Sequence, residues 1–143
     1  MKRATQSHGR ATSGRLLAAA TALFLVANLV AACAAAAPAL VGHTWKLVAV
    51  GDRPPVADGQ ITFTADGQAS FQTGCNMGGG SYRVLAASID FGTTMMTEMA
   101  CDGPRGAQEQ RFMAVIESDP LFVVTDDRLT LGSGIDSLTF VRA

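Results

Sequence analysis

The feature that most constrains the fold is the alternation of apolar and polar residues, with a period of two, from about residue 41 to the end of the chain. This alternation is typical of strands that bury one face. The clearest hairpin has Asp66-Gly67 at its turn, between segments 61–64 and 69–72, because this dipeptide favours the tight turns that join antiparallel strands. Further segments that we expect to form strands are 45–50, 82–85, 88–91, 121–124, 128–131 and 138–141.

One segment, 104–118, has helical periodicity. Pro104 suits the first turn of a helix, because an N–H there has no intrahelical partner, and Asp102 is placed to cap the helix. Pro120 follows the end of the segment and cannot continue it. The sequence therefore predicts a small antiparallel α+β domain, with about eight short strands in a barrel-like or strongly curved sheet and one helix near 104–118.

The beginning of the chain has a different composition. Four basic residues and no acidic one occur among the first 15 residues, and the run 16–37 is apolar. A basic region followed by an apolar run that ends among small residues is typical of an export signal. A membrane-spanning helix is the alternative, but the run is rich in alanine and contains Thr21 and Asn28, so its hydrophobicity is modest for a span.

The end of this run favours a lipoprotein signal. Val30-Ala31-Ala32-Cys33 resembles a bacterial lipobox, in which small residues precede the cysteine that is lipidated. Ala34 stands where some lipoproteins have the aspartate that retains them in the inner membrane, so we expect an outer-membrane anchor with the domain facing the periplasm. The predicted signal peptide, lipidated cysteine with its tether, and folded domain are residues 1–32, 33–40 and 41–143.

Removing the signal changes the net charge. Residues 33–143 contain one lysine and six arginines against 12 acidic residues, a formal charge of −5. The arginines are scattered and form no basic stripe in the sequence. We therefore expect no nucleic-acid partner.

Two cysteines, Cys75 and Cys101, remain for the domain once Cys33 is assigned to lipid. In an oxidising compartment two such cysteines most often pair, and free buried thiols are the alternative. Thiol catalysis would need His43 as its base, because His8 leaves with the signal, and nothing in the spacing favours that arrangement. No close ligand pair such as C-x-x-C indicates a zinc site.

Two other patterns contain residue types that can bind a phosphate or a metal ion. The glycine triplet 78–80 is followed by no lysine, so it does not match a phosphate-binding P-loop. Met95, Met96 and Met99 are compatible with a soft metal ion, but such a cluster more often fills an irregular gap in a core, and we expect the latter. The sequence thus predicts no catalytic residue, no cofactor and no metal site.

The strongest pattern is a pair of motifs that flank a strand with Ile89-x-Phe91 and precede a helix with Glu109-x-x-Phe112. The motif residues are Gly74, Cys75, Asn76, Gly80, Tyr82, Thr97, Met99, Ala100 and Cys101. Together they resemble the META domain family, which includes the bacterial heat-shock lipoprotein HslJ. The resemblance implies a small, β-rich and often exported domain with no established catalytic activity. Bacterial members are linked to stress and to resistance to the antibiotic novobiocin.

The resemblance also implies that the Gly74-Cys75-Asn76 segment is a structural corner. Gly74 and the glycine triplet would then form tight turns with positive φ at the end of a strand. The amide of Asn76 would bond neighbouring backbone groups. A disulfide between Cys75 and Cys101 would hold this corner against the start of the helix.

These observations predict a non-enzymatic, lipid-anchored envelope protein that acts in stress or antibiotic tolerance through binding or envelope maintenance. Its expected partners are the membrane, through the N-terminal lipid, and an unidentified envelope protein or small molecule. Two alternatives remain: a lipocalin-like binder that holds an apolar ligand inside a β cavity, and an inhibitor that presents a loop to an envelope enzyme.

Overall fold

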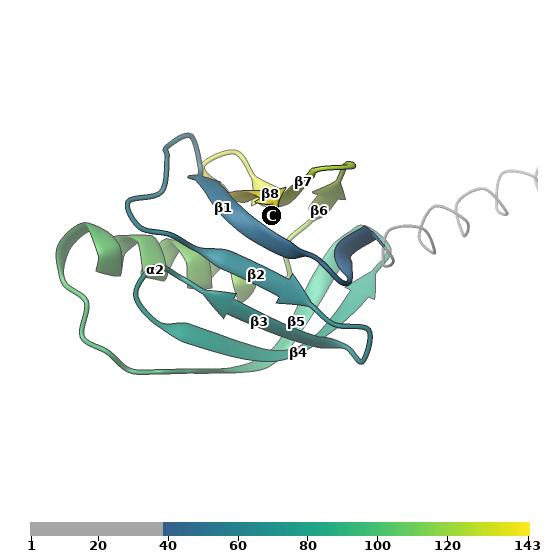
Figure 1. Cartoon of the computed structure of the whole chain (residues 1–143), viewed down its shortest axis with the longest axis horizontal. Coiled ribbons are helices and arrows are strands. Elements are labelled where there is room, and N and C mark those ends of the chain that lie inside the picture. The colour runs from purple at the N-terminus through teal and green to yellow at the C-terminus, as the bar shows by residue number, and fades with distance from the viewer. Residues whose placement is uncertain (1–38) are drawn as a thin grey trace, which may run out of the picture. The chain divides into compact units, whose positions relative to one another are not determined.

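The computed structural model describes residues 39–143, which form eight antiparallel strands and one long helix (Figure 1). The predicted small antiparallel α+β fold is confirmed. The predicted signal peptide, Cys33 and most of the tether lie outside the described residues. In chain order the elements are β1 Thr44–Val50, β2 Gln60–Phe63, β3 Gln68–Gln72, β4 Met77–Leu85, β5 Ser88–Met96, α2 Gly103–Ile116, β6 Phe122–Val124, β7 Arg128–Ser133 and β8 Asp136–Arg142.

All eight strands belong to one curled sheet, in the order β5-β4-β3-β2-β1-β8-β7-β6. The two ends of this order meet at one place, where Ile89 N donates to Pro120 O at 3.0 Å and Phe122 N donates to Ala87 O at 3.0 Å. Helix α2 connects β5 to β6 and lies across the inner side of the sheet (Figure 1). The sheet is therefore a half-barrel, closed in part by backbone hydrogen bonds and in part by the helix.

The core lies between the sheet and α2. Phe112 points from the helix into the sheet, where its ring centroid is 5.8 Å from that of Phe71 and 6.1 Å from that of Phe140. Trp45 of β1 is fully buried, and its Nε1–H donates to Leu40 O at 3.0 Å. Aromatic rings that cover large apolar areas thus join the helix to both halves of the sheet.

Helix α2 begins near the predicted position but ends earlier. Asp102 is the N-cap residue and has an extended backbone, yet its side chain makes no capping hydrogen bond. Pro104 lies in the first turn, as predicted. The helix ends at Ile116, and Ser118, the last residue of the predicted helix, lies in the turn that follows.

The glycine triplet 78–80 was predicted wrongly. These glycines lie inside β4, and none of them has a positive φ. A Cβ on Gly79 would lie 2.6 Å from the carbonyl oxygen of Ala69 on β3. The triplet therefore allows close approach of neighbouring strands rather than tight turns. Because glycine is depleted in strands, no signal in the sequence indicated that β4 begins at Met77 and that β5 extends to Met96.

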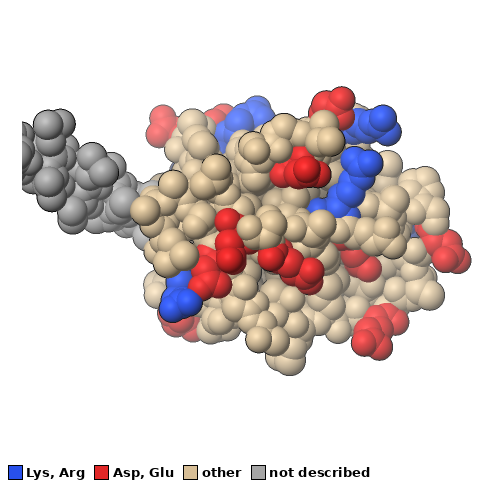
Figure 2. All heavy atoms as spheres, turned by 180° about the vertical axis from the view of Figure 1, so that it is seen from behind, with Lys and Arg blue, Asp and Glu red and all other residues tan. Residues whose placement is uncertain are grey.

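The surface has more acidic than basic side chains. On the face drawn in Figure 2, acidic side chains are spread over the domain, and the basic ones occupy separate places. Among the described residues, no helix is long and apolar enough to span a bilayer.

Candidate functional site

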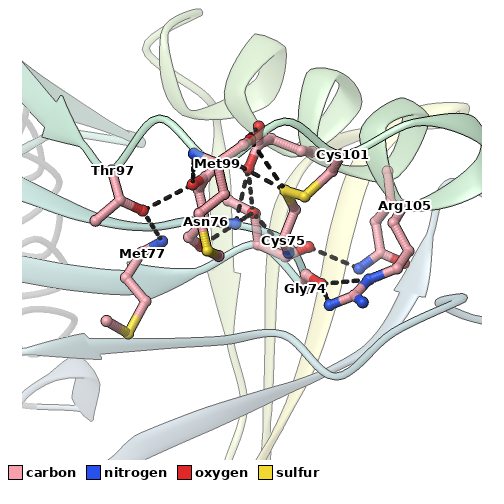
Figure 3. The surroundings of a disulfide bond; sticks show 11 residues. Gly74, Cys75, Asn76, Met77, Thr97, Met99, Cys101 and Arg105 are labelled. Carbon is pink, nitrogen blue, oxygen red and sulfur yellow. Dashed lines mark hydrogen bonds between the residues drawn. A yellow bond between two sulfur atoms is a disulfide. The ribbon is translucent and has the colours of Figure 1, made fainter.

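The Gly74-Cys75-Asn76 segment joins β3 to β4 and faces the first turns of α2 (Figure 3). Gly74 has a φ of +93°, in the left-handed region that was predicted for it. A Cβ at this position would lie 2.6 Å from Gln108 Nε2 and 2.9 Å from the Ala57 side chain. Glycine is therefore needed here both for the backbone conformation and for the close approach of the helix.

Asn76 connects this corner to the segment between β5 and α2. Its side chain is 3% exposed. The amide oxygen accepts hydrogen bonds from Thr97 Oγ1 at 2.7 Å and from Met99 N at 2.8 Å. The amide nitrogen donates to Met99 O at 3.1 Å and to Glu109 Oε1 at 3.1 Å. One side chain thus binds residues 97–99 and the helix to the corner directly before β4, which gives the two sequence motifs a shared structural role.

Glu109 brings a negative charge to the same cluster. Its Oε2 accepts hydrogen bonds from Thr73 Oγ1 at 2.6 Å and from Asn76 N at 3.0 Å. Partial burial raises the pKa of Glu109, but the hydrogen bonds from Thr73 and from the side chain and backbone of Asn76 outweigh it, so the pKa lies below its ordinary value. Within residues 39–143 no lysine or arginine forms an ion pair with this carboxylate.

Gln108 fixes the loop between β1 and β2 to the helix. The side chain is 5% exposed. Its Oε1 accepts from Val56 N at 2.7 Å and from Ala57 N at 3.3 Å. Its Nε2 donates to Ala57 O at 2.9 Å and to Thr73 O at 2.7 Å. These four bonds satisfy the buried amide completely and hold the loop against α2.

A disulfide joins Cys75 to Cys101, which are 26 positions apart in the sequence and have Cα atoms 6.2 Å apart. Figure 3 shows the bond between the corner and the residue that precedes α2 by two positions. The Arg105 guanidinium adds a second link, because its Nε and Nη2 donate to Gly74 O at 3.0 and 2.6 Å. In this structure Cys75 is thus part of a covalent cross-link and not a free thiol.

The remaining motif residues lie outside this cluster. Tyr82 lies on β4, away from the corner, and its hydroxyl donates to Thr64 O at 3.0 Å. Gly80 also lies on β4, at the register shift between β4 and β5. Ala100 is an exposed residue in the segment before the helix. The motif thus contains one compact cluster and several residues that shape strands around it.

The prediction that the three methionines fill the core was wrong for two of them. Met95 is 78% exposed and Met99 is 59% exposed, and only Met96 packs against the core. Met95 and Met96 alternate in direction on β5, so only one of this pair can face inward. Met99 follows the strand in an exposed segment.

Sequence reasoning missed the roles of Thr73, Arg105 and Gln108, and it assigned no role to Glu109. A signal for Gln108 was present, because it precedes the buried residue Phe112 by four positions and therefore lies on the same face of the helix. Nothing in the sequence pairs these residues with the corner. Among residues 39–143 no group of three or more His, Cys, Asp or Glu side chains is arranged to hold a metal ion.

The corner also lines an open hollow of about 390 Å³ on the surface of the domain. Met77, Met99 and Arg105 contribute to its rim, and Asn76 and Cys75 contribute to its floor and sides. Exposed thioethers are flexible and polarisable, and such side chains adapt to differently shaped apolar surfaces. This arrangement is suited to contact with a partner molecule.

Comparison with known proteins agrees with this architecture. The profile of the META domain matches residues 38–143 of the chain. The chain belongs to the META domain family. No curated protein sequence matches this META domain protein.

Two structures determined by NMR share its fold. One is 20% identical, covers 71% of this chain and 90% of its own, and has a TM-score of 0.63. The other, from Burkholderia xenovorans, is 22% identical, covers 100% of this chain and 99% of its own, and has a TM-score of 0.57. At these identities the likeness concerns the fold alone.

Proposed function

We propose that this META domain protein is a lipid-anchored protein of the bacterial envelope that acts in stress or antibiotic tolerance by binding, without catalysing a reaction. The observation that carries the proposal is the state of the motif cluster. The thiol of Cys75 is in a disulfide, and the polar groups of Asn76, Gln108 and Glu109 are hydrogen-bonded to protein partners. Within the described residues no buried side-chain nitrogen or oxygen is left without a hydrogen bond. The chemical groups of this cluster are already occupied by the disulfide and by hydrogen bonds within the domain. This favours a role as a binding surface over a role as a reaction centre.

The membrane anchor is the second part of the proposal. Val30-Ala31-Ala32-Cys33 follows a basic and apolar leader, and Cys33 would carry the lipid. Ala34 lacks the negative charge that retains some lipoproteins in the inner membrane. The domain would then face the periplasm from the outer membrane.

The Cys33→Ser variant tests the anchor. We expect it to lose labelling by a clickable fatty-acid analogue and to move from the membrane fraction to the soluble fraction. Ala35→Ser is the matched control, because it changes a neighbouring residue of the tether and keeps the thiol. Labelling of Cys33→Ser at the level of Ala35→Ser would show that Cys33 is not the lipidated residue.

A ligand inside the half-barrel, as in a lipocalin, is less well supported. Trp45, Phe63, Phe112 and Phe140 fill the space between sheet and helix, and all four are fully buried. An apolar ligand there would have to displace these side chains. Binding at the outer surface requires no such rearrangement. Native mass spectrometry of the protein purified from its own envelope tests this choice, since a stoichiometric small molecule released only on unfolding would favour an internal site.

A further inference from the structure

A groove on the outer surface runs beside α2, on the side of the loop that connects β1 and β2. It consists of two adjoining hollows of about 190 Å³ and about 310 Å³, both of which include Val50 and Arg111. The first lies between the loop and the helix, and the second continues toward the turn before β8. Between Pro104 and Val115, which line opposite ends, α2 rises about 16 Å at 1.5 Å per residue.

The floor of the groove is apolar. The apolar residues Val50, Pro54, Val56 and Ala107 line the first hollow. Val56 is a large apolar side chain that is 58% exposed to water. An aliphatic chain that covers these side chains would remove apolar area from water on both partners, which favours binding.

The walls of the groove are held in place. Three hydrogen bonds of the Gln108 side chain fix residues 56 and 57 of the loop to the helix. Val50 and Arg53 exchange backbone hydrogen bonds of 2.9 and 3.2 Å, and Gly51 N donates to Ser137 O at 2.7 Å. A ligand would therefore not have to order this loop, which lowers the entropic cost of binding.

Among the described residues, Arg53 and Arg111 line the first hollow and no acidic residue lines it, whereas Asp136 lines the far end of the second hollow together with Arg111. The positive end of the groove is therefore the first hollow. Arg111 makes no hydrogen bond or ion pair with any of the residues 39–143, and Arg53 has only Asp52 at 3.9 Å, with both side chains well exposed. These cations stand out in a segment, 33–143, whose formal charge is −5. Arginine binds carboxylate and phosphate through two parallel N–H donors.

We propose that this groove binds a free, single-chain anionic amphiphile such as a long-chain carboxylate. Its chain would lie along the apolar floor, and its head group would bind Arg111 and Arg53. An extended peptide fits less well, because it needs hydrogen-bonding partners along its backbone, whereas the loop N–H groups of Val50, Arg53 and Val56 are already bonded within the domain. The proposal does not depend on lipidation of Cys33.

Photo-crosslinking tests the site on the whole protein, with phosphatidylcholine nanodiscs present in the solution. The probe is a laurate analogue that carries a diazirine at the end of its chain, and mass spectrometry locates the labelled residues. We expect labelling of the residues of the groove, competition by excess laurate, and a loss of about tenfold in Arg111→Gln. Arg128→Gln, an exposed arginine on β7 outside both hollows, is the control and should label like the unchanged protein.

Two further arms separate the contributions of the head and the chain. The methyl ester of the probe should label the unchanged protein about as weakly as the carboxylate labels Arg111→Gln. Ala107→Phe, which fills the groove without changing a charge, should also reduce labelling. Circular dichroism checks that each variant is folded.

Three outcomes would overturn the proposal. They are equal labelling by the carboxylate and its ester, equal labelling of Arg111→Gln and Arg128→Gln, and labelling that lies outside the groove. A fourth arm uses photoactivatable phosphatidylglycerol in the nanodisc. If this phospholipid labels the groove and the carboxylate does not, the arginines contact a bilayer surface and not a free amphiphile, and the proposal is wrong.

Discussion

Replacing Glu109 by glutamine should lower the free energy of unfolding by about 1–3 kcal/mol. The carboxylate accepts three hydrogen bonds, from Thr73 Oγ1, from Asn76 N and from Asn76 Nδ2. Glutamine keeps the shape of the side chain but turns one acceptor oxygen into a donor, so at least one donor of the cluster loses its partner. An unpaired buried donor costs about 1–3 kcal/mol, and hydrogen bonds to a charged group are the stronger ones.

The loss of stability in Glu109→Gln should become smaller as the pH falls. The pKa of Glu109 is lowered in the folded protein from the ordinary value of 4.5, because the three hydrogen bonds outweigh partial burial. A lowered folded-state pKa adds stability that is fully present above the unfolded-state pKa and is lost as the pH falls through the folded-state pKa. The stability difference between the unchanged protein and Glu109→Gln should therefore be largest near pH 7 and should shrink as the pH falls below 4.5 toward the folded-state pKa.

Urea unfolding followed by tryptophan fluorescence measures this directly. Trp45 is the only tryptophan of the chain and is fully buried, so its emission reports on the core. Glu117→Gln is the matched control, because it is the same change at the exposed C-cap of the same helix. Equal loss of stability in the two variants, or a difference that stays constant from pH 7 to about pH 3, would refute the assigned role of Glu109.

Two further predictions concern the covalent link and the strands. Cys75→Ser and Cys101→Ser should each lower the free energy of unfolding by roughly 3 to 4 kcal/mol on the chain-entropy model, and the double variant should cost little more, because one bond is lost in all three. Mass spectrometry of the non-reduced protein checks the bond, and two alkylatable thiols in the domain would contradict it. Gly79→Ala should lower the melting temperature more than Gly92→Ala. The new methyl group at position 79 would lie 2.6 Å from a backbone carbonyl oxygen of β3, which cannot move aside. The methyl group at position 92 would meet the Ser81 hydroxyl, which can rotate away. Equal shifts would show that close approach of the strands is not what requires Gly79.

The sequence by itself determined the features that depend on neighbouring residues. The Asp66-Gly67 turn and the alternation on both sides of it predicted the hairpin of β2 and β3 to within a residue or two. Pro104 placed the start of α2 in the same way. These signals are local, because a turn and a strand face are set by the chemistry of a few consecutive residues. The predicted leader, too, rests on a pattern of consecutive residues.

Only the tertiary structure decided how distant segments meet. Glu109 binds Asn76 from 33 positions away, and Gln108 binds the loop at Val56 from 52 positions away. The glycine triplet was misread for the same reason, because its requirement for glycine comes from the adjacent strand β3 and not from its own neighbours. Alternation shows which face of a strand is buried, but it does not show which remote polar group lies opposite. The hydrogen-bonded corner and the groove beside α2 exist because the half-barrel curls until the helix closes it, and that curvature is a property of the whole sheet.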